Sequence, residues 1–190
     1  MRLKHRTAMA LILMLVGSFM AWRMKPAPNR MAGPGSPSRQ PDKQAAEWPA
    51  YGRDKANSKY SPLDQISQDN VTKLRIAWRW PSPDAAVLRS HPDITPGHYE
   101  TTPLMVHGVL YASSSLSQVS AINPVTGRTL WTFDPQAYER SAPPNEGFVH
   151  RGVAYWEDRK ERRIFLATAK AELIALAAET GKPISSFGTL

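Results

Sequence analysis

Residues Ala121 to Trp131 read AINPVTGRTLW, and the same pattern returns 54 residues later, where Ala175 to Ser185 read ALAAETGKPIS. Each stretch leaves a small or apolar strand end, passes through Thr-Gly and continues into another strand-like run. Gly127 and Gly181 stand where a turn between strands requires positive φ, and the preceding threonine hydroxyl can bond the turn's own backbone. The pattern favours hairpins at the same place in two repeated sheets, such as propeller blades, over two unrelated turns that share Thr-Gly by chance.

Short strand candidates surround each turn, and each group of four antiparallel strands is what one propeller blade requires. The first group contains a two-residue hairpin turn at His107-Gly108. Its strands are expected at Thr101 to Val106, Val109 to Ser113, Val119 to Asn123 and Thr129 to Asp134. Those of the second group are expected at Gly152 to Glu157, Arg162 to Ala169, Glu172 to Ala177 and Lys182 to Phe187. The prediction is an all-β fold of the β-propeller type, with about two blades present, at roughly 100–135 and 152–187.

Aromatic residues indicate how these sheets meet their neighbours. Trp131 and Phe133 share one face of their strand, where a large indole can wedge between neighbouring sheets. Upstream, residues 74–80 alternate between apolar and other side chains with period two, which predicts a further strand with one apolar face. A short helical turn is expected at 65–74, and residues 81–99, rich in Pro, Asp and His, are expected to form a loop.

The first part of the chain has the composition of a targeting segment and a tether. Residues 1–23 combine a basic start with an apolar run closed by Arg23, which predicts a secretory signal peptide or an uncleaved membrane anchor. Residues 24–46 hold five prolines, two glycines and many polar residues, which predicts a disordered linker. The folded body is expected at 47–190, outside the cytoplasm.

The charge of the chain is unevenly placed. The formal net charge is +8, but residues 1–45 hold eight of the 24 Lys and Arg residues and one of the 16 Asp and Glu residues. The remaining chain is nearly neutral and has no basic stripe of the kind that phosphate binding requires, so nucleic acid is not an expected partner. There is no cysteine, which excludes disulfides and thiolate metal sites.

Two opposite charges stand at equivalent points of the two predicted blades. Glu100 directly precedes the first strand of one blade, and Arg151 directly precedes the first strand of the other. Since loops that enter the innermost strands form one mouth of a propeller channel, both charges are expected near the same mouth. The alternative is that they are two unrelated, solvated loop charges.

Several motifs, taken in order, resemble the N-terminal portion of the pyrroloquinoline quinone (PQQ) dependent dehydrogenases, the quinoprotein alcohol and glucose dehydrogenases. They are WPAYGRDKANSKYSPLDQI, NVTKLRIAW, YETTPLMVHGVLYASS, AINPVTGRTLW, FVHRGVAYW and IFLATAKAELIALAAETGKPISSFG. The resemblance covers about residues 47–190. It implies an eight-bladed β-propeller whose blades are joined by tryptophan docking motifs; Ala121 to Trp131 is one, and the second copy has Ser185 at the tryptophan position.

The resemblance also implies cofactor contacts. Glu100 in YETTP and Arg151 in HRGVAYW match family positions that contact the quinone, and His150 is a weaker candidate because a loop histidine is more often a surface group. A guanidinium can pair with a cofactor carboxylate in bidentate fashion. The family's calcium ligands and its catalytic Asp base are expected beyond residue 190, so we expect no catalytic and no metal-binding residue in this chain, and no dehydrogenase activity from it alone.

The activity implied for the intact protein is oxidation of an alcohol or sugar by hydride transfer to the quinone, with electrons passed to a respiratory acceptor. The loop before Arg151 lacks the adjacent cysteines of some alcohol-oxidising relatives, which leans toward the glucose type. The implied location is periplasmic, secreted or anchored to the outer face of the cytoplasmic membrane. The alternative is a non-catalytic propeller that serves as a protein-binding scaffold in the cell envelope. The Glu100 and Arg151 motifs argue against a scaffold, which would not require them.

Overall fold

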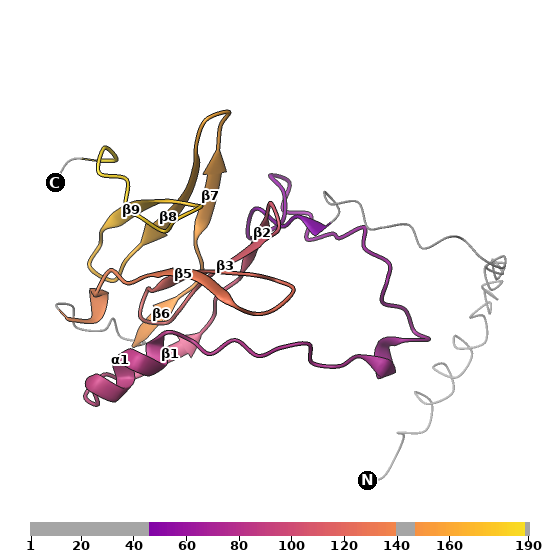
Figure 1. Ribbon diagram of the computed structural model, residues 1–190, viewed down its shortest axis with the longest axis horizontal. Coiled ribbons are helices and arrows are strands. Elements are labelled where there is room, and N and C mark those ends of the chain that lie inside the picture. The colour runs from indigo at the N-terminus through magenta and orange to yellow at the C-terminus, as the bar shows by residue number, and fades with distance from the viewer. Residues whose placement is uncertain (1–45, 140–146, 189–190) are drawn as a thin grey trace, which may run out of the picture. The chain divides into compact units, whose positions relative to one another are not determined.

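The computed structural model describes residues 46–139 and 147–188, and most of its regular structure is β-strand (Figure 1). The strands form a four-stranded sheet, a three-stranded sheet and a two-stranded sheet. The predicted signal or anchor at 1–23 and nearly all of the predicted linker at 24–46 lie outside the described residues. Within the described ranges, no helix has the length and apolar character needed to cross a bilayer. The predicted all-β class is confirmed.

The four-stranded sheet is the first predicted blade. Its strands pair antiparallel in chain order, and they are β2 (Leu104–Val106), β3 (Val109–Ser113), β4 (Val119–Ile122) and β5 (Thr129–Phe133). The predicted hairpin turn between β2 and β3 is confirmed, since His107 and Gly108 both have positive φ, at 49° and 75°. That geometry suits a tight two-residue turn because it follows the natural twist of the two strands.

The three-stranded sheet corresponds to the second predicted blade. It contains β7 (Ala154–Glu157), β8 (Arg162–Ala167) and β9 (Leu173–Ala177), again antiparallel in chain order. The fourth strand expected at 182–187 is reduced to a single bridge between Leu176 and Pro183. Proline has no N–H to donate, so the ladder cannot continue through this position in the ordinary way.

The two Thr-Gly turns have the same geometry. Gly127 and Gly181 both adopt positive φ, at 70° and 69°. In the first turn the Gly127 N–H donates to the Asn123 carbonyl at 2.9 Å, and in the second the Gly181 N–H donates to the Ala177 carbonyl at 2.8 Å. The bonded residues differ by the same 54 positions in both cases, so the turns are equivalent parts of a repeated unit, as the sequence predicts.

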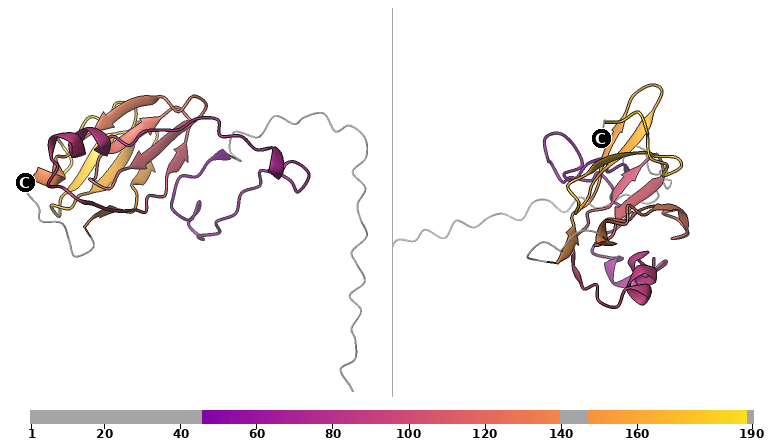
Figure 2. Two further views of the ribbon diagram at one scale, coloured as in Figure 1. Left: turned by 90° about the horizontal axis from the view of Figure 1, so that it is seen from below. Right: turned by 90° about the vertical axis from the view of Figure 1, so that its left-hand side faces the viewer.

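The two sheets pack against each other through a shared apolar core (Figure 2). Residues that alternate along the strands point into the core, which is the expected behaviour of a sheet with one covered face. The buried members of this core come from both sheets: Leu104, Val106, Tyr111, Val119 and Ala121 from the first, and Ile164, Leu166, Leu176 and Ala178 from the second and its turn.

Two tryptophans make equivalent contacts with the two turns. Trp131, on β5 of the first sheet, donates its indole N–H to the Ala178 carbonyl at 3.0 Å. Trp78 donates its indole N–H to the Pro124 carbonyl at 2.9 Å. Each acceptor lies three residues before the turn glycine. The predicted role of Trp131 as a wedge between sheets is confirmed, and Trp78 makes the equivalent contact with the first turn from the segment before the first sheet.

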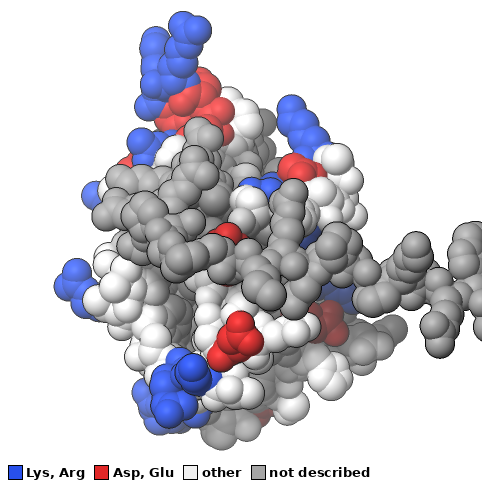
Figure 3. All heavy atoms as spheres, turned by 90° about the vertical axis from the view of Figure 1, so that its right-hand side faces the viewer, with Lys and Arg blue, Asp and Glu red and all other residues white. Residues whose placement is uncertain are grey.

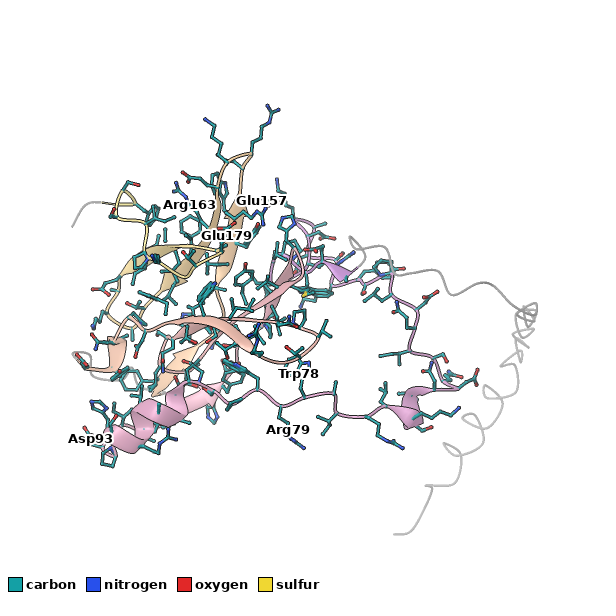
Figure 4. All side chains as sticks on the ribbon, in the orientation of Figure 1. Trp78, Arg79, Asp93, Glu157, Arg163 and Glu179 are labelled. Atoms are coloured by element: carbon teal, nitrogen blue, oxygen red, sulfur yellow. The ribbon has the colours of Figure 1, made fainter. Side chains whose placement is uncertain are left out.

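The segment before the first sheet departs from the prediction. Residues 74–80 are extended, but they belong to no ladder within the described part of the chain, so the expected strand is absent there. Leu74 and Ile76 are accordingly 56% and 68% exposed. In Figure 4, Trp78 and Arg79 leave this segment on opposite sides. The expected helical turn is present as the 3₁₀ helix Val71–Lys73.

The expected loop at 81–99 contains regular structure. It holds the helix α1 (Asp84–Ser90) and the strand β1 (Pro96–Tyr99). β1 pairs in parallel with β6 (Phe148–His150), some 50 residues later in the chain. Both elements depend on contacts with distant residues, which a local pattern does not reveal. The β1–β6 pair positions the candidate site.

Candidate functional site

Glu100 and Arg151 emerge side by side because each follows one strand of the β1–β6 pair. Tyr99 pairs with His150 in the parallel register, so the next residue of each strand lies at the same end of the pair. The Arg151 Nε donates to Glu100 Oε2 at 3.1 Å. The sequence expectation that both charges lie near one opening is matched by a direct contact between them.

The acid and the cation line a hollow of about 580 Å³. This volume lies within the range of small-molecule sites in proteins. The lining residues are Tyr51, Glu100, Thr102, Leu104, Arg151, Gly152 and Val153. The hollow therefore combines one acid, one cation, one hydroxyl of Thr102 and one phenol with an apolar wall.

The ion pair is open to solvent and can be rearranged by a ligand. The Arg151 side chain is 83% exposed and the Glu100 side chain is 44% exposed. Exposed pairs of this kind contribute little to stability, because water screens the charges. A guanidinium held this loosely can exchange the Glu100 carboxylate for a ligand carboxylate or share its donors between the two.

The backbone beneath the pair is tightly held by two threonines that the sequence analysis did not single out. The Thr102 N–H donates to the Arg151 carbonyl at 3.2 Å. The Thr101 hydroxyl lies 3.1 Å from the His150 carbonyl and 2.9 Å from the Ser113 carbonyl, both of which can accept its proton. The repeated threonines of the YETTP motif were the available signal, since a hydroxyl beside a strand end commonly bonds neighbouring backbone.

Gly152 allows the backbone after Arg151 to lie close to the backbone after Glu100. Its φ of 138° is rarely adopted by residues with a side chain, and a Cβ there would lie 3.2 Å from the Thr102 carbonyl oxygen. The glycine of the HRG motif is thus required by the contact between the two chain segments, and it lets the backbone after Arg151 pass against the backbone after Glu100.

His150 lies in the interior and is 8% exposed. Its ring nitrogens lie 2.7 Å from the Ser113 hydroxyl and 2.9 Å from the Ala167 carbonyl oxygen. Burial lowers the pKa of the imidazole below its ordinary value of 6.5. The described residues that line the hollow do not include His150, so its predicted contact with a cofactor stays a prediction.

No set of three or more His, Cys, Asp or Glu side chains within the described ranges is arranged to hold a metal ion. On the face shown in Figure 3, Lys and Arg side chains form a few small, separate groups, and several lie beside Asp or Glu. Glu100 and Arg151 are the charged residues among the described ones that line the hollow.

Comparison with known proteins identifies the family of this chain. Residues 48–190 match the family model described as PQQ, glucose/ethanol/alcohol dehydrogenase, beta-propeller domain. The chain is 38% identical over 147 residues to the dehydrogenase subunit of alcohol dehydrogenase (quinone) from Gluconobacter oxydans, covering 76% of this chain and 17% of that protein. It is 31% identical over 199 residues to quinoprotein glucose dehydrogenase from Escherichia coli, covering 95% of this chain and 24% of that protein.

The structural comparison gives the same family. The crystal structure of quinohemoprotein alcohol dehydrogenase from Comamonas testosteroni matches with a TM-score of 0.57 and 34% identity, over 73% of this chain and 18% of that chain. This chain spans about a fifth of the length of the relatives that it matches. With two sheets of a propeller in place and most of its length matched, the chain belongs to the family of PQQ-dependent alcohol and glucose dehydrogenases.

Proposed function

We propose that this chain supplies part of the cofactor site of a dehydrogenase that oxidises an alcohol or sugar with PQQ, and that Glu100 and Arg151 contact the quinone. The observation that carries the proposal is the Arg151–Glu100 contact at 3.1 Å on the wall of a hollow of ligand size. The family supports the identity of the cofactor.

The residues of the hollow fit the chemistry of this cofactor. PQQ carries three carboxylates and an ortho-quinone, so an exposed guanidinium can bind a carboxylate through two parallel hydrogen bonds. Glu100 can accept a hydrogen bond from a ring or acid hydrogen of the same molecule. When bound, the quinone accepts the hydride removed from the alcohol carbon. The role of this chain is to bind and orient the cofactor.

The substrate and the electron acceptor of the whole protein are further parts of this proposal. The relatives include both alcohol and glucose dehydrogenases, and the lack of adjacent cysteines in the loop before Arg151 favours the sugar-oxidising type. We also propose a calcium ion held by ligands outside this chain, a respiratory electron acceptor, and a periplasmic, secreted or membrane-anchored location through the basic and apolar segment at 1–23.

Calorimetric titration of the purified chain with PQQ tests the cofactor proposal. We expect binding by the wild-type chain and binding weaker by about tenfold or more for Arg151→Ala, because a hydrogen bond to a charged group is removed. Arg79→Ala is the matched control, since Arg79 is exposed and points away from the body of the sheets. No binding by the wild type, or equal binding by Arg151→Ala, contradicts the proposal.

A dye-reduction assay tests the expectation that this chain alone is inactive. PQQ, calcium and a panel of alcohols and aldoses are added to the purified chain, and the reduction of a redox dye is followed. We expect no reduction above the free-quinone control, because the metal ligands and base of the family are not expected in residues 1–190. Substrate-dependent reduction by the protein contradicts that expectation.

A further inference from the structure

The hydrogen bonds of His150 determine which ring nitrogen carries the proton. Nε2 lies 2.9 Å from the Ala167 carbonyl oxygen, which can only accept, so Nε2 must be the donor. Nδ1 lies 3.2 Å from the Gly152 amide nitrogen, whose N–H can only donate, so Nδ1 must be the acceptor. Both contacts therefore require a neutral ring with its proton on Nε2.

The peptide bond between Arg151 and Gly152 is held from both sides. Its carbonyl oxygen, on Arg151, accepts from the Thr102 N–H at 3.2 Å. Its N–H, on Gly152, donates to His150 Nδ1. A peptide unit is planar, so fixing both groups fixes the orientation of the plane and with it the backbone from which the Arg151 side chain departs.

We propose that His150 is a positioning residue, which orients Arg151 toward the hollow by accepting the Gly152 N–H on an unprotonated Nδ1. This inference rests on the proposed function of Arg151 as a quinone contact. His150 suits the task because its other contacts anchor it to both sheets: Ser113 belongs to β3 and Ala167 to β8. The orientation of the Arg151 side chain is thereby coupled to the packing of the two sheets.

The surroundings of the ring keep it neutral. The groups that bond it are the Ser113 hydroxyl from β3, the Ala167 carbonyl from β8 and the Gly152 N–H after β6, and none of them carries a charge. The charged side chains that follow β6 and β1, Arg151 and Glu100, line the hollow, and His150 is not among its described lining residues. Burial lowers the imidazole pKa, so a second proton, which would turn Nδ1 into a donor and break the Gly152 bond, is added only in acid.

A pair of isosteric variants separates the two ring nitrogens. His150→Asn places an amide oxygen near the position of Nδ1 and can still accept from Gly152 and Ser113, while it cannot titrate. His150→Gln places its amide near Nε2 and can still donate to Ala167, but it offers no acceptor at Nδ1. Both variants remove the imidazole from the interior, so a role in packing alone predicts similar behaviour for the two.

Three measurements on the 190-residue chain test the proposal. We expect ¹⁵N shifts of the His150 ring to show a proton on Nε2 at neutral pH, and amide exchange at Gly152 to be slow in the wild type and in His150→Asn but fast in His150→Gln. We expect PQQ affinity to be near wild type in His150→Asn and about tenfold weaker in His150→Gln. The affinity of the wild type for PQQ should fall in acid as the His150 imidazole is protonated. The affinity of His150→Asn should lack this part of the pH dependence, because its side chain does not titrate.

Two different failures can be told apart in these experiments. A wild-type chain that binds no PQQ, or binds it equally well after Arg151→Ala, contradicts the proposed function. A chain that binds PQQ through Arg151, but in which His150→Gln binds as well as His150→Asn, contradicts the positioning role. A proton on Nδ1, or unprotected exchange at Gly152 in the wild type, overturns the role whatever the binding result.

Discussion

The indole of Trp131 lies directly against Gly181, and a Cβ added to this glycine would be 2.7 Å from the indole Cδ2. The glycine therefore serves two purposes: its φ of 69° closes the turn, and its lack of a side chain makes room for the ring. The same relationship joins Trp78 to Gly127, where the corresponding Cδ2 would be 2.6 Å from an added Cβ. The contact of each tryptophan with its turn thus depends on both the indole ring and the glycine.

Gly181→Ala is expected to destabilise the contact between the two sheets. The alanine requires an unfavourable backbone conformation, at about 1–2 kcal/mol, and displaces the Trp131 ring, at about 1–3 kcal/mol more. Gly108→Ala is the matched control, because Gly108 has a similar φ of 75° but no heavy atom within 4 Å of an added Cβ. The measurement is the free energy of unfolding in urea. Equal losses in the two variants would show that the indole contact contributes nothing.

Trp78→Leu is expected to release the extended segment 74–80 from the first sheet. The substitution removes the hydrogen bond to the Pro124 carbonyl and the ring that covers Gly127. Limited proteolysis should therefore cut faster within this segment, because unfolding it locally requires less free energy. Ile76→Ala is the control, since Ile76 is 68% exposed. Cleavage that is unchanged in Trp78→Leu would mean that other contacts hold the segment.

A contact between the β2–β3 turn and β7 should make the packing of the sheets depend on pH. Glu157 Oε2 lies 2.7 Å from His107 Nε2 and accepts from the Tyr155 hydroxyl at 2.8 Å. These hydrogen bonds, first that of His107 and then that of Tyr155, lower the pKa of Glu157 below its ordinary value of 4.5. The resulting stabilisation is present above that value and is lost as pH falls through the lowered pKa.

Glu157→Gln should therefore lower the melting temperature at neutral pH and have little effect in acid, once the pH is below the lowered pKa and the native carboxylate is itself protonated. Because the Glu157 side chain is 44% exposed, the expected loss is small, about 0.2–1 kcal/mol. A double-mutant cycle with His107→Ala measures the coupling between the two side chains. A coupling of zero, or an effect of Glu157→Gln that grows in acid, contradicts this prediction.

The sequence predicts well those parts of the fold that local residues determine. The turns at Gly127 and Gly181 and the hairpin at His107 depend on residues within a few positions, and the structure contains all three. The strand limits are less well predicted. The first predicted strand begins at Thr101, but β2 begins at Leu104, because Thr101 and Thr102 bond to the segment around Arg151 instead.

The parts that were missed depend on distant partners. Period-two alternation at 74–80 indicates a face that can be buried, but it does not supply a neighbouring strand. The β1–β6 pair joins segments that are some 50 residues apart, and its register is visible only in three dimensions. The equivalence of Glu100 and Arg151 could be predicted from their positions before repeated strands. The threonines of the YETTP motif gave only a general signal for backbone bonding, and neither the Arg151 carbonyl as the partner of Thr102 nor the bond from Gly152 to His150 could be predicted.

The helix α1 is held by one buried acid at its first residue. Asp84 is 6% exposed, and its carboxylate accepts three hydrogen bonds from the β3–β4 loop. Ser114 and Gln118 donate to Oδ1 at 2.5 and 3.0 Å, and the Leu116 N–H donates to Oδ2 at 3.2 Å. Since α1 leads through β1 to Glu100, this anchor connects the first sheet to the candidate site.

Asp84→Asn tests the anchor with a change of only one atom. One position of the side chain becomes an NH₂ group, which cannot accept from the Leu116 N–H, so a buried donor is left without its partner. The expected loss is about 1–3 kcal/mol of unfolding free energy, read as a lower midpoint in urea. Asp93→Asn is the control, because Asp93 is exposed just after the helix (Figure 4). If the two variants unfold at the same urea concentration, α1 is held by its apolar contacts, Val87 and Leu88, and the acid is dispensable.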